Sequence, residues 1–501
     1  MSDDVETSAV PDPRTLGAVP DPAASAAAAS ADSSPVIPPS ATRKGSDSWP
    51  MWVLGFVVLT DQIDQSILRG VLEQLRAEFG LSDPQLGLLA SCFILVNGLI
   101  TIPAGYLADR WNRTRTVGHT MLLWSGITAI TAAAPNYGFL VAVRSALGFG
   151  QAITEPSANS LVADYYPLEE RGKAFSIQQV MGMVGMGIGL GLGGLVGATL
   201  GWRWAFLIVG SPSVVVAFMV YRLREPRRGA ADRMHAGVSE SDEDDDGLGP
   251  NLLDEGLRVF FREMARGLVA DMKTISRIRT MRYALVGVGV LLFTVTGISV
   301  WLPSFYERQL GVAGGTAQLL VGSLLILGGI PGVLYGGKVA DKYVTRIQGG
   351  RMAIPAMCIF IGNLFFMVSY ARLAVLPTYL LQLVGIFALT MSIPALRAGL
   401  SDAVPANLRG AGFGAFNLAS VLFGQAAAPL VVSFLSNAYD DNLRTAFVII
   451  SFPVFLGAAL LFSARKHLEA DTAKIFEAVL TAMQEQKQRE EELRQGHLDE
   501  V

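Results

Sequence analysis

Apolar stretches of about twenty residues recur from Trp52 to Ala464, and they constrain the fold more than any other feature. Each is long enough to cross roughly 30 Å of hydrocarbon as a helix. Runs such as residues 122–135 lack the polar stripe that a helix on a soluble protein keeps. We therefore predict an all-α, multi-pass integral membrane protein. Twelve spans are expected, at residues 51–73, 85–108, 116–134, 138–163, 174–199, 203–222, 283–306, 317–340, 352–371, 374–400, 411–436 and 443–464.

Composition argues against several classes of function. The chain has 501 residues, of which 51% are hydrophobic and only 16% are charged, too little charge for a soluble protein of this length. A net charge of −4 argues against a nucleic-acid partner, because nothing would neutralise a run of phosphates. The sequence has no P-loop, no serine-nucleophile motif and no cluster among its 4 histidines and 2 cysteines. We expect no enzyme activity, no metal and no cofactor.

Polar segments divide the chain into five expected parts. Residues 1–48 lack the basic and apolar regions of a signal peptide and predict a disordered cytoplasmic tail. In the linker at residues 223–281, an acidic run at residues 239–247 precedes residues 252–279, which alternate apolar and basic side chains at helical spacing. That pattern predicts an amphipathic helix on the inner membrane surface or a plain linker helix. The other parts are bundles at residues 49–222 and 282–464 and a charged helical tail at residues 465–501.

Basic residues alternate between the loops, which predicts the orientation in the membrane. Loops rich in lysine and arginine follow the second, fourth, sixth and eighth expected spans, whereas the loops between them are poor in these residues. Short basic loops stay in the cytoplasm, so both termini are expected there, in the cell (inner) membrane. The basic residues include Arg110, Arg113, Arg115, Arg171 and Lys173.

An internal repeat divides the spans into two halves. The pattern P-x7-D-x2-P-x3-R-G-x2-F runs from Pro156 to Phe175 and recurs from Pro394 to Phe413, 238 residues later. The stretch GYLADR at Gly105 has a weaker counterpart, GKVADK, at Gly337. Six matched residues at one offset are hard to obtain by chance, so we predict two related bundles of six helices each.

Charged residues at the cytoplasmic helix ends form a candidate gate. Paired bundles enclose a site at the bilayer midplane and rock about it, which is the alternating-access arrangement of secondary transporters. An aspartate at a helix end can bond facing arginines only while the cytoplasmic side is shut, and Gly105 would let helices approach closely there. The arginines could equally be topology signals alone. The candidate gate residues are Gly105, Asp109, Arg110, Arg113, Asp164, Arg171, Asp341, Asp402 and Arg409.

Two stretches resemble the signatures of a known family. GYLADRWNRTR at residues 105–115 resembles the loop signature after the second helix of the major facilitator superfamily, and Arg144-x-x-x-Gly148-x-Gly150 resembles its fourth-helix signature. The resemblance covers residues 50–465 and implies the major facilitator fold. Residues 61–113 are also similar to the Spinster group. That similarity implies a carrier of lysophospholipids or of sphingoid lipids such as sphingosine phosphate, coupled in some cases to protons.

The chain departs from the Spinster pattern at two places. Where the group has an arginine beside the acid of the first helix, this chain has Gln65 after Asp64. Where the group tends to have a glutamate seven residues after the fourth-helix arginine, this chain has Gln151, and Glu155 follows one turn later. If coupling in the group depends on that glutamate, its role here is either moved to Glu155 or absent.

Few charged residues lie within the expected spans, and each is a functional candidate because inserting it costs about 2.5–3.5 kcal/mol. Asp61 and Asp64 share one face of the first span, and Arg69 lies about a turn and a half closer to the outside. Arg144 and Glu155 share a face of the fourth span, because eleven residues are close to three turns. We predict a pair between Asp64 and Arg144, with Glu155 nearer the cytoplasm.

These charges predict proton sites and substrate sites. A carboxylate surrounded by hydrocarbon can bind and release a proton, so Asp64 and Glu155 are the coupling candidates. An anionic headgroup requires a cation that donates two parallel hydrogen bonds, for which Arg144 comes first, followed by Arg69 and Arg397. Alternatively, Asp64 and Arg144 form a purely structural pair, and Arg397 extends to the cytoplasmic edge. Asp61 and Gln151 complete the candidate site.

The sequence therefore predicts a secondary active transporter, expected as a monomer in the lipid bilayer. Its substrate is expected to be an anionic or zwitterionic lipid of lysophospholipid or sphingoid type, moved by alternating access with or without coupling to protons. The alternative is a proton-linked transporter of small organic anions or drugs. A lipid carrier needs a long apolar groove that opens between spans, whereas an anion carrier needs a closed and more cationic pocket.

Overall fold

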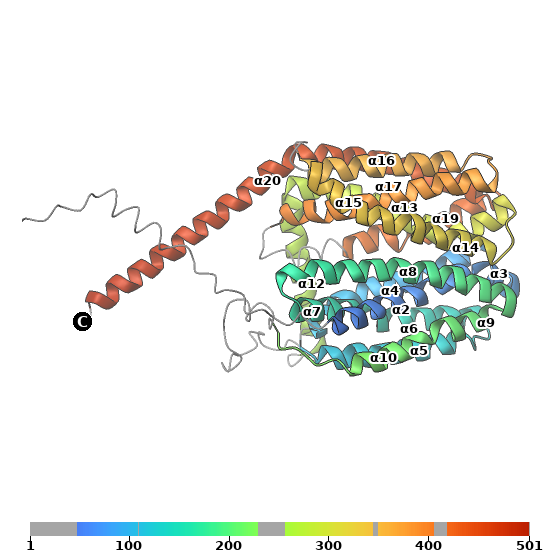
Figure 1. Cartoon of the computed structure of the whole chain (residues 1–501), viewed down its shortest axis with the longest axis horizontal. Helices are drawn as coiled ribbons and strands as arrows, with labels where there is room; N and C mark the ends of the chain where they lie inside the picture. The colour runs from blue at the N-terminus through green and yellow to red at the C-terminus, as the bar shows by residue number, and fades with distance from the viewer. Residues whose placement is uncertain (1–47, 109, 229–255, 344–348, 405–417, 500–501) are drawn as a thin grey trace, which may run out of the picture. The chain divides into compact units, whose positions relative to one another are not determined.

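The computed structural model describes residues 48–108, 110–228, 256–343, 349–404 and 418–499. The expected disordered tail, apart from Ser48, and the acidic run at residues 239–247 lie outside the described residues. From Trp49 onward the chain forms one unit of nearly parallel helices (Figure 1).

The N-terminal half consists of long helices that run back and forth. Helix α2 packs along α8, α4 along α6, and α10 along α5. The elements are α2 (Trp49–Gly70), α3 (Leu72–Phe79), α4 (Asp83–Ala108), α5 (Arg113–Thr131), α6 (Tyr137–Ala152), α7 (Thr154–Tyr165), α8 (Leu168–Leu200), α9 (Trp202–Trp204), the π-helical turn η2 (Ala205–Val209) and α10 (Pro212–Tyr221).

The C-terminal half repeats this arrangement after α12 (Leu257–Arg277). Helix α15 packs along α17, as α4 does along α6, and α16 packs along α20, as α5 does along α10. The elements are α13 (Arg279–Leu310), α14 (Thr316–Leu324), η3 (Leu325–Gly329), α15 (Ile330–Tyr343), α16 (Gly350–Ser369), α17 (Val375–Asp402), η5 (Val421–Gln425), α19 (Ala428–Ala438) and α20 (Leu443–Asp499).

Every expected span coincides with at least one described helix. Eight segments are long and apolar enough by themselves to cross a membrane. The remaining expected spans correspond to α2, α5, α6 with α7, and η5 with α19. These carry charged or polar residues in mid-span or are broken into shorter pieces. Helix α2 contains Asp61, Asp64 and Arg69, and α6 ends at Ala152 before α7 begins. In α2 and in α6 with α7, the deviations from a plain apolar helix fall where functional charges were expected.

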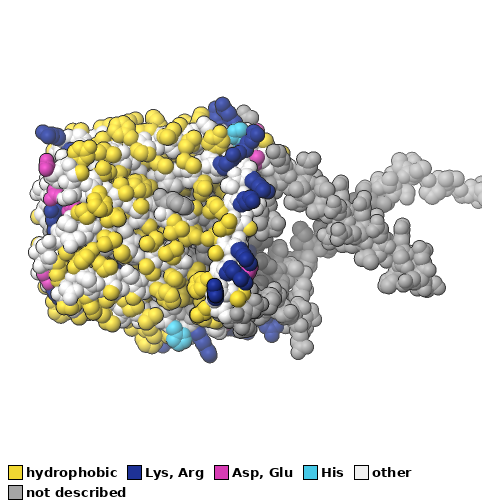
Figure 2. Space-filling view, turned by 180° about the vertical axis from the view of Figure 1, so that it is seen from behind, with side chains coloured by type: hydrophobic (Ala, Val, Ile, Leu, Met, Phe, Trp, Pro, Cys, Tyr) yellow, Lys and Arg dark blue, Asp and Glu magenta, His cyan; other side chains and the backbone are white. Residues whose placement is uncertain are grey.

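Side-chain types are sorted along the helix axes. A broad apolar band covers the middle of the face in Figure 2, with arginine and lysine side chains gathered at one end. This end carries α12, and we call it the linker end; the opposite end, with α3, is called the far end (Figure 1). A band of apolar side chains between two polar rims is the surface that a bilayer requires.

Local sequence fixes several helix ends. The side chain of Asn112 accepts a hydrogen bond from the amide of Arg115 and caps α5, and Asn136 caps α6 through the amide of Phe139. Each satisfies an amide that the first helical turn leaves without a partner. Helix α13 ends at Gly311, whose φ of 66° is left-handed and accessible to glycine without strain.

The buried core is continuous across both halves only toward the far end. There one cluster contains Leu75 and Trp202 of the N-terminal half together with Trp301 and Phe447 of the C-terminal half. Toward the linker end the core divides. One cluster, around Trp124, belongs to the N-terminal half, and a second, which includes Met281, Met352 and Leu461, belongs to the C-terminal half. Among the described residues, the two halves thus share one buried core at the far end and have separate cores toward the linker end.

The surroundings of the glycines also differ between the far end and the linker end. At Gly187 of α8, an added Cβ would lie 2.9 Å from the carbonyl oxygen of Gly322 in α14, so the halves touch closely there. At Gly105 and Gly337, near the linker end, an added Cβ would meet no described atom within 4 Å. The expectation that Gly105 lets helices meet closely applies to the shut state of the cytoplasmic side and stays a prediction.

Candidate functional site

Asp64 lies in the interior of the N-terminal half and is only 2% exposed. Its Oδ1 accepts a hydrogen bond of 2.6 Å from the hydroxyl of Thr128 on α5. Its Oδ2 accepts one of 3.1 Å from the amide nitrogen of Gln151 at the end of α6. The carboxyl of Asp64 is thus held by two uncharged donors from two other helices.

Arg144 is equally buried, at 2% exposed, and lies two turns before Gln151 on α6. Its guanidinium carbon is 5.1 Å from the centre of the Phe206 ring, a cation–π distance. Its Nε has no hydrogen-bond partner, and no hydrogen bond or ion pair joins Arg144 to any residue that the structure describes. A buried guanidinium without acceptors is costly and rare, so this arginine is available to a ligand.

The predicted direct pair between Asp64 and Arg144 is wrong. Their charges interact, but no ion pair joins them; the oxygens of Asp64 accept hydrogen bonds from Thr128 and Gln151 instead. Arg69, expected as a second cation, is half-buried on α2, and its charge interacts with that of Arg144. The structure therefore brings two cations and one acid together without neutralising either cation by direct contact.

A second group of charges lies between the halves, on the linker side of Asp64. Asp61 is half-buried, and its Oδ2 accepts a hydrogen bond of 2.9 Å from Gln65, while its Oδ1 has no partner. Glu155, in the first turn of α7, is exposed and interacts electrostatically with Asp61 and with Arg397 of α17. Arg397 is exposed as well. Exposed charges that interact across the two halves face the space that opens toward the linker end.

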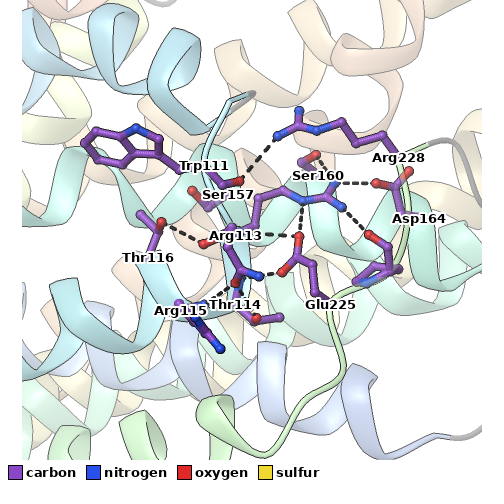
Figure 3. A network of polar contacts seen from close by, with 12 residues as sticks. Trp111, Arg113, Thr114, Arg115, Thr116, Ser157, Ser160, Asp164, Glu225 and Arg228 are labelled. Atoms are coloured by element: carbon purple, nitrogen blue, oxygen red, sulfur yellow. Dashed lines mark hydrogen bonds and ion pairs between the residues drawn. The ribbon is translucent and has the colours of Figure 1, made fainter. Parts of the chain in front are cut away.

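Among the candidate gate residues, Arg113 is the centre of a polar network at the linker end, which we call the Arg113 cluster (Figure 3). Its side chain is 1% exposed and forms ion pairs with Asp164 of α7 and, at 2.9 Å, with Glu225 after α10. It also donates to the hydroxyl of Ser160 and the carbonyl of Pro226, both at 2.8 Å. Asp164 and Ser160 belong to the N-terminal half, and Glu225 and Pro226 follow directly after its last helix, α10.

The other candidate gate residues also bond within the N-terminal half or lie outside the described residues. The Nε of Arg171 donates to the carbonyls of Ala163 and Tyr166 at the end of α7. The guanidinium of Arg110 lies 3.7 Å from the ring centre of Tyr106. Asp109 and Arg409 lie outside the described residues, as do the side chains of Asp341 and Asp402.

A second network, which we call the far-end network, joins the two halves. Arg308 of α13 pairs with Glu73 of α3 at 2.6 Å and with both oxygens of Asp83 of α4 at 2.9 Å. Asp83, whose side chain is fully buried, also pairs with Arg76 and accepts from Ser436 of α19. Arg76 in turn pairs with Asp441 at 2.8 Å. Three residues of each half contribute: Glu73, Arg76 and Asp83, and Arg308, Ser436 and Asp441.

Sequence reasoning missed Thr128, Phe206, Glu225 and the far-end network. Thr128 and Phe206 are ordinary members of apolar spans, and no pattern distinguishes them. Arg308 was visible only as a basic residue of an outer loop. Within the part of the chain that the structure describes, no group of three or more histidine, cysteine or acidic side chains is placed to hold a metal ion.

Residues 54–429 match the family model described as the Major Facilitator Superfamily. Among similar proteins, Protein spinster homolog 3 of Homo sapiens is 24% identical over 455 residues, covering 85% of this chain and 85% of that protein. The D-galactonate transporter of Escherichia coli is 25% identical over 431 residues, covering 84% of this chain and 96% of the relative.

A solved structure has a similar fold. A bacterial homolog to the human lysosomal transporter Spinster, in an inward-facing and unoccupied conformation, superimposes with a TM-score of 0.68 at 21% identity. The match covers 86% of this chain and 99% of that structure. The similar proteins include both Spinster proteins and galactonate transporters, so the similarity indicates the fold of a transporter and not one substrate.

Proposed function

The chain belongs to the Major Facilitator Superfamily and is a multi-pass membrane transporter rather than an enzyme, and on that premise we propose that it moves an anionic or zwitterionic lipid by alternating access, coupled to protons. The lipid is of the lysophospholipid or sphingoid type, as the similarity to the Spinster proteins suggests. The protein works as a monomer in the cell (inner) membrane, and its basic linker end and both termini face the cytoplasm.

The observation that carries this proposal is the unpartnered guanidinium of Arg144. Its Nε and the rest of its planar fork suit two oxygens of one phosphate, and a buried charge-assisted pair of this kind is strong. Phe206 covers one face of the guanidinium and excludes water from that side. Arg69, whose charge interacts with that of Arg144, adds a second positive charge. A phosphate that enters between the halves therefore gains the acceptor contacts that the protein itself does not supply.

Asp64 is the proposed proton-coupling site, because its neighbours can form hydrogen bonds with both its ionised and its protonated carboxyl. The amide of Gln151 donates to a carboxylate through Nε2, and Oε1, which has no partner, could accept from a carboxylic acid after the amide flips. Protonation of Asp64 removes the negative charge that interacts with Arg144 and so strengthens the hold of Arg144 on an anion. Proton and substrate then favour each other's binding, which is the thermodynamic requirement for moving both in one direction.

Asp61 and Glu155 provide the proton route between Asp64 and the linker end, and Arg397 interacts with Glu155 from the other half. Glu155 is exposed, and its charge interacts with that of Asp61, three residues from Asp64 on the same helix. A proton released by Asp64 can therefore pass by way of these carboxyls toward the open side. In this proposal Glu155 replaces the carboxyl that is missing at Gln151.

The decisive experiment is uptake of a labelled lysophospholipid into proteoliposomes, with and without an imposed pH gradient. The wild-type protein is expected to show gradient-stimulated uptake. Asp64→Asn and Arg144→Ala are each expected to abolish it while still inserting into the membrane. Arg115→Ala and Asp440→Asn, which alter exposed charges outside the site, serve as matched controls and are expected to retain uptake. Wild-type rates in both site variants would refute the assignment of the site.

The second candidate is a proton-linked transporter of small organic anions, which the similarity to the galactonate transporter favours. The same unpartnered Arg144 suits a carboxylate as well as a phosphate. D-galactonate is therefore included in the uptake assay as a labelled substrate and as a competitor. Galactonate flux without lipid movement would replace the lipid by a small anion and leave the roles of Asp64 and Arg144 to be tested with that substrate.

A further inference from the structure

Helix α12 connects the two halves at the linker end without crossing the membrane. Phe260, 2% exposed, contacts the ring of Tyr106 in the N-terminal half at 5.1 Å between centroids. Ile275, near the other end of α12, is buried in the core cluster of the C-terminal half. The helix therefore spans both halves, and Figure 1 shows it running crosswise to the long helices. A helix in this position lies parallel to the membrane plane.

The outer surface of α12 carries exposed apolar and basic side chains side by side. At 100° per residue, Leu257 and Phe261, 66% and 55% exposed, lie about 40° apart and border the packed face. The exposed cations Arg258, Arg262, Arg266, Lys273 and Arg277 fill an arc of about 100° farther from the packed face. Val269, 66% exposed, lies within this arc, between Arg258 and Arg262 when viewed down the helix axis.

The charge of α12 is strongly unbalanced. Its sequence has 5 basic and 2 acidic residues. Glu263 pairs with Arg266 at 2.8 Å and with Arg262 at 3.4 Å, and so partly neutralises these two. Arg258, Lys273 and Arg277 form no ion pair with a residue whose side chain the structure describes. An occupant of this surface must be apolar on one side and negatively charged beside it.

We propose that the exposed surface of α12 binds the anionic phospholipids of the adjoining membrane leaflet. Leu257, Phe261 and Val269 insert among the first carbons of the acyl chains, and the arginines hold the phosphates above them. Charge complementarity, the exposed apolar side chains beside the cations and the orientation parallel to the membrane plane all favour a lipid surface over a soluble acidic protein. This inference does not depend on which substrate is transported.

The test uses the full chain in vesicles with and without an anionic lipid. Cys92 and Cys358 are replaced by alanine, and an environment-sensitive fluorophore is attached at Val269→Cys. Vesicles contain about 30% phosphatidylglycerol in phosphatidylcholine, with bromine atoms on the acyl chains of one lipid or the other. The proposal predicts quenching that is at least about twofold stronger, per molecule, from brominated phosphatidylglycerol.

Charge variants decide whether α12 itself selects the lipid. The triple variant Arg258→Gln, Lys273→Gln, Arg277→Gln is expected to lose the preference for phosphatidylglycerol. Its matched control, Arg115→Gln, Lys173→Gln, Arg222→Gln, removes three exposed cations from the same end and is expected to keep it. Equal quenching by the two lipids in the wild type would overturn the proposal. The absence of quenching by either lipid would also overturn the proposal and would indicate that this surface binds a soluble partner instead.

Discussion

Arg113 and Arg308 are both arginines among carboxylates, but they connect different parts of the molecule. Arg113 bonds Asp164 of its own half and Glu225 directly after that half's last helix, whereas Arg308 bonds Glu73 and Asp83 across the two halves. In an alternating-access cycle each half moves as a body, so contacts inside a half persist and contacts between halves must break. The first arginine is therefore expected to stabilise a bundle, and the second to set the balance between conformations.

The largest expected effect is that of Arg113→Ala on stability. Removal of this side chain breaks its ion pairs with Asp164 and Glu225, in a place where Arg113 is 1% exposed. Loss of one partner of a buried ion pair costs about 3–5 kcal/mol, so the apparent melting temperature in detergent should fall by several degrees. Arg115→Ala, on the exposed side of the same helix turn, is the control and should melt like the wild type. An unchanged melting temperature in Arg113→Ala would remove the distinction between the two arginines.

Arg308→Ala is expected to change conformation more than stability. Its contacts with Glu73 and Asp83 exist only while the far end is shut, and their loss should destabilise that state by roughly 2–3 kcal/mol. The shift corresponds to about 30- to 150-fold in the equilibrium between conformations.

Distances between spin labels measure this shift. One label is placed at Gln85 in the N-terminal half and the other at Tyr439 in the C-terminal half, both exposed at the far end. The population with a long distance should grow in Arg308→Ala and stay unchanged in Arg372→Ala, which removes an exposed cation. A distance distribution identical to the wild type would mean that the far-end network does not hold the halves together.

A pair of glycines tests the same asymmetry through packing. Gly187→Ala adds a methyl group 2.9 Å from a backbone carbonyl of the other half, so it should weaken closure of the far end. Gly105→Ala adds its methyl group to open space and should leave the spin-label distances unchanged. The effect is expected to be smaller than that of Arg308→Ala, because the helices can yield by a fraction of an ångström. Equal effects of the two substitutions would contradict the asymmetry of the interface.

The smallest expected effect is the dependence of stability on pH through Glu225. Burial alone would raise the pKa of Glu225, but hydrogen bonds from the Thr114 amide and from Arg113 outweigh it and hold the pKa below the ordinary value of 4.5. The stabilising contribution of Glu225 is therefore complete above pH 4.5 and is lost as the pH falls below that value.

Melting curves of the wild type and of Glu225→Gln between about pH 6 and pH 3 measure this contribution. The melting temperature of the wild type should fall more steeply toward the acid end than that of the variant. Parallel curves would mean that the interactions of Glu225 do not contribute to the stability of the Arg113 cluster.

The fold was predictable from sequence because its signals are local and repeated. Apolar runs give the spans, and the two copies of the proline, aspartate and arginine pattern give the two halves. Asp64, Arg144 and Glu155 were identified as candidates because a charged side chain inside a membrane span is energetically costly and is usually retained for function. Their contacts were not predictable. The hydrogen-bond donors to Asp64 are Thr128 and Gln151, which lie on two other helices. A single sequence does not show how these helices are rotated relative to one another.

The amino-acid sequence by itself determined that this chain spans a membrane as two related bundles, because hydropathy and spacing act along the chain. Only the tertiary structure decided which end is shut. Arg308 lies 235 residues from Glu73 and 225 from Asp83, and each of these residues alone resembles a solvated loop charge. A network between distant segments depends on how the two bundles dock, and docking is governed by surfaces that form only after each bundle has folded.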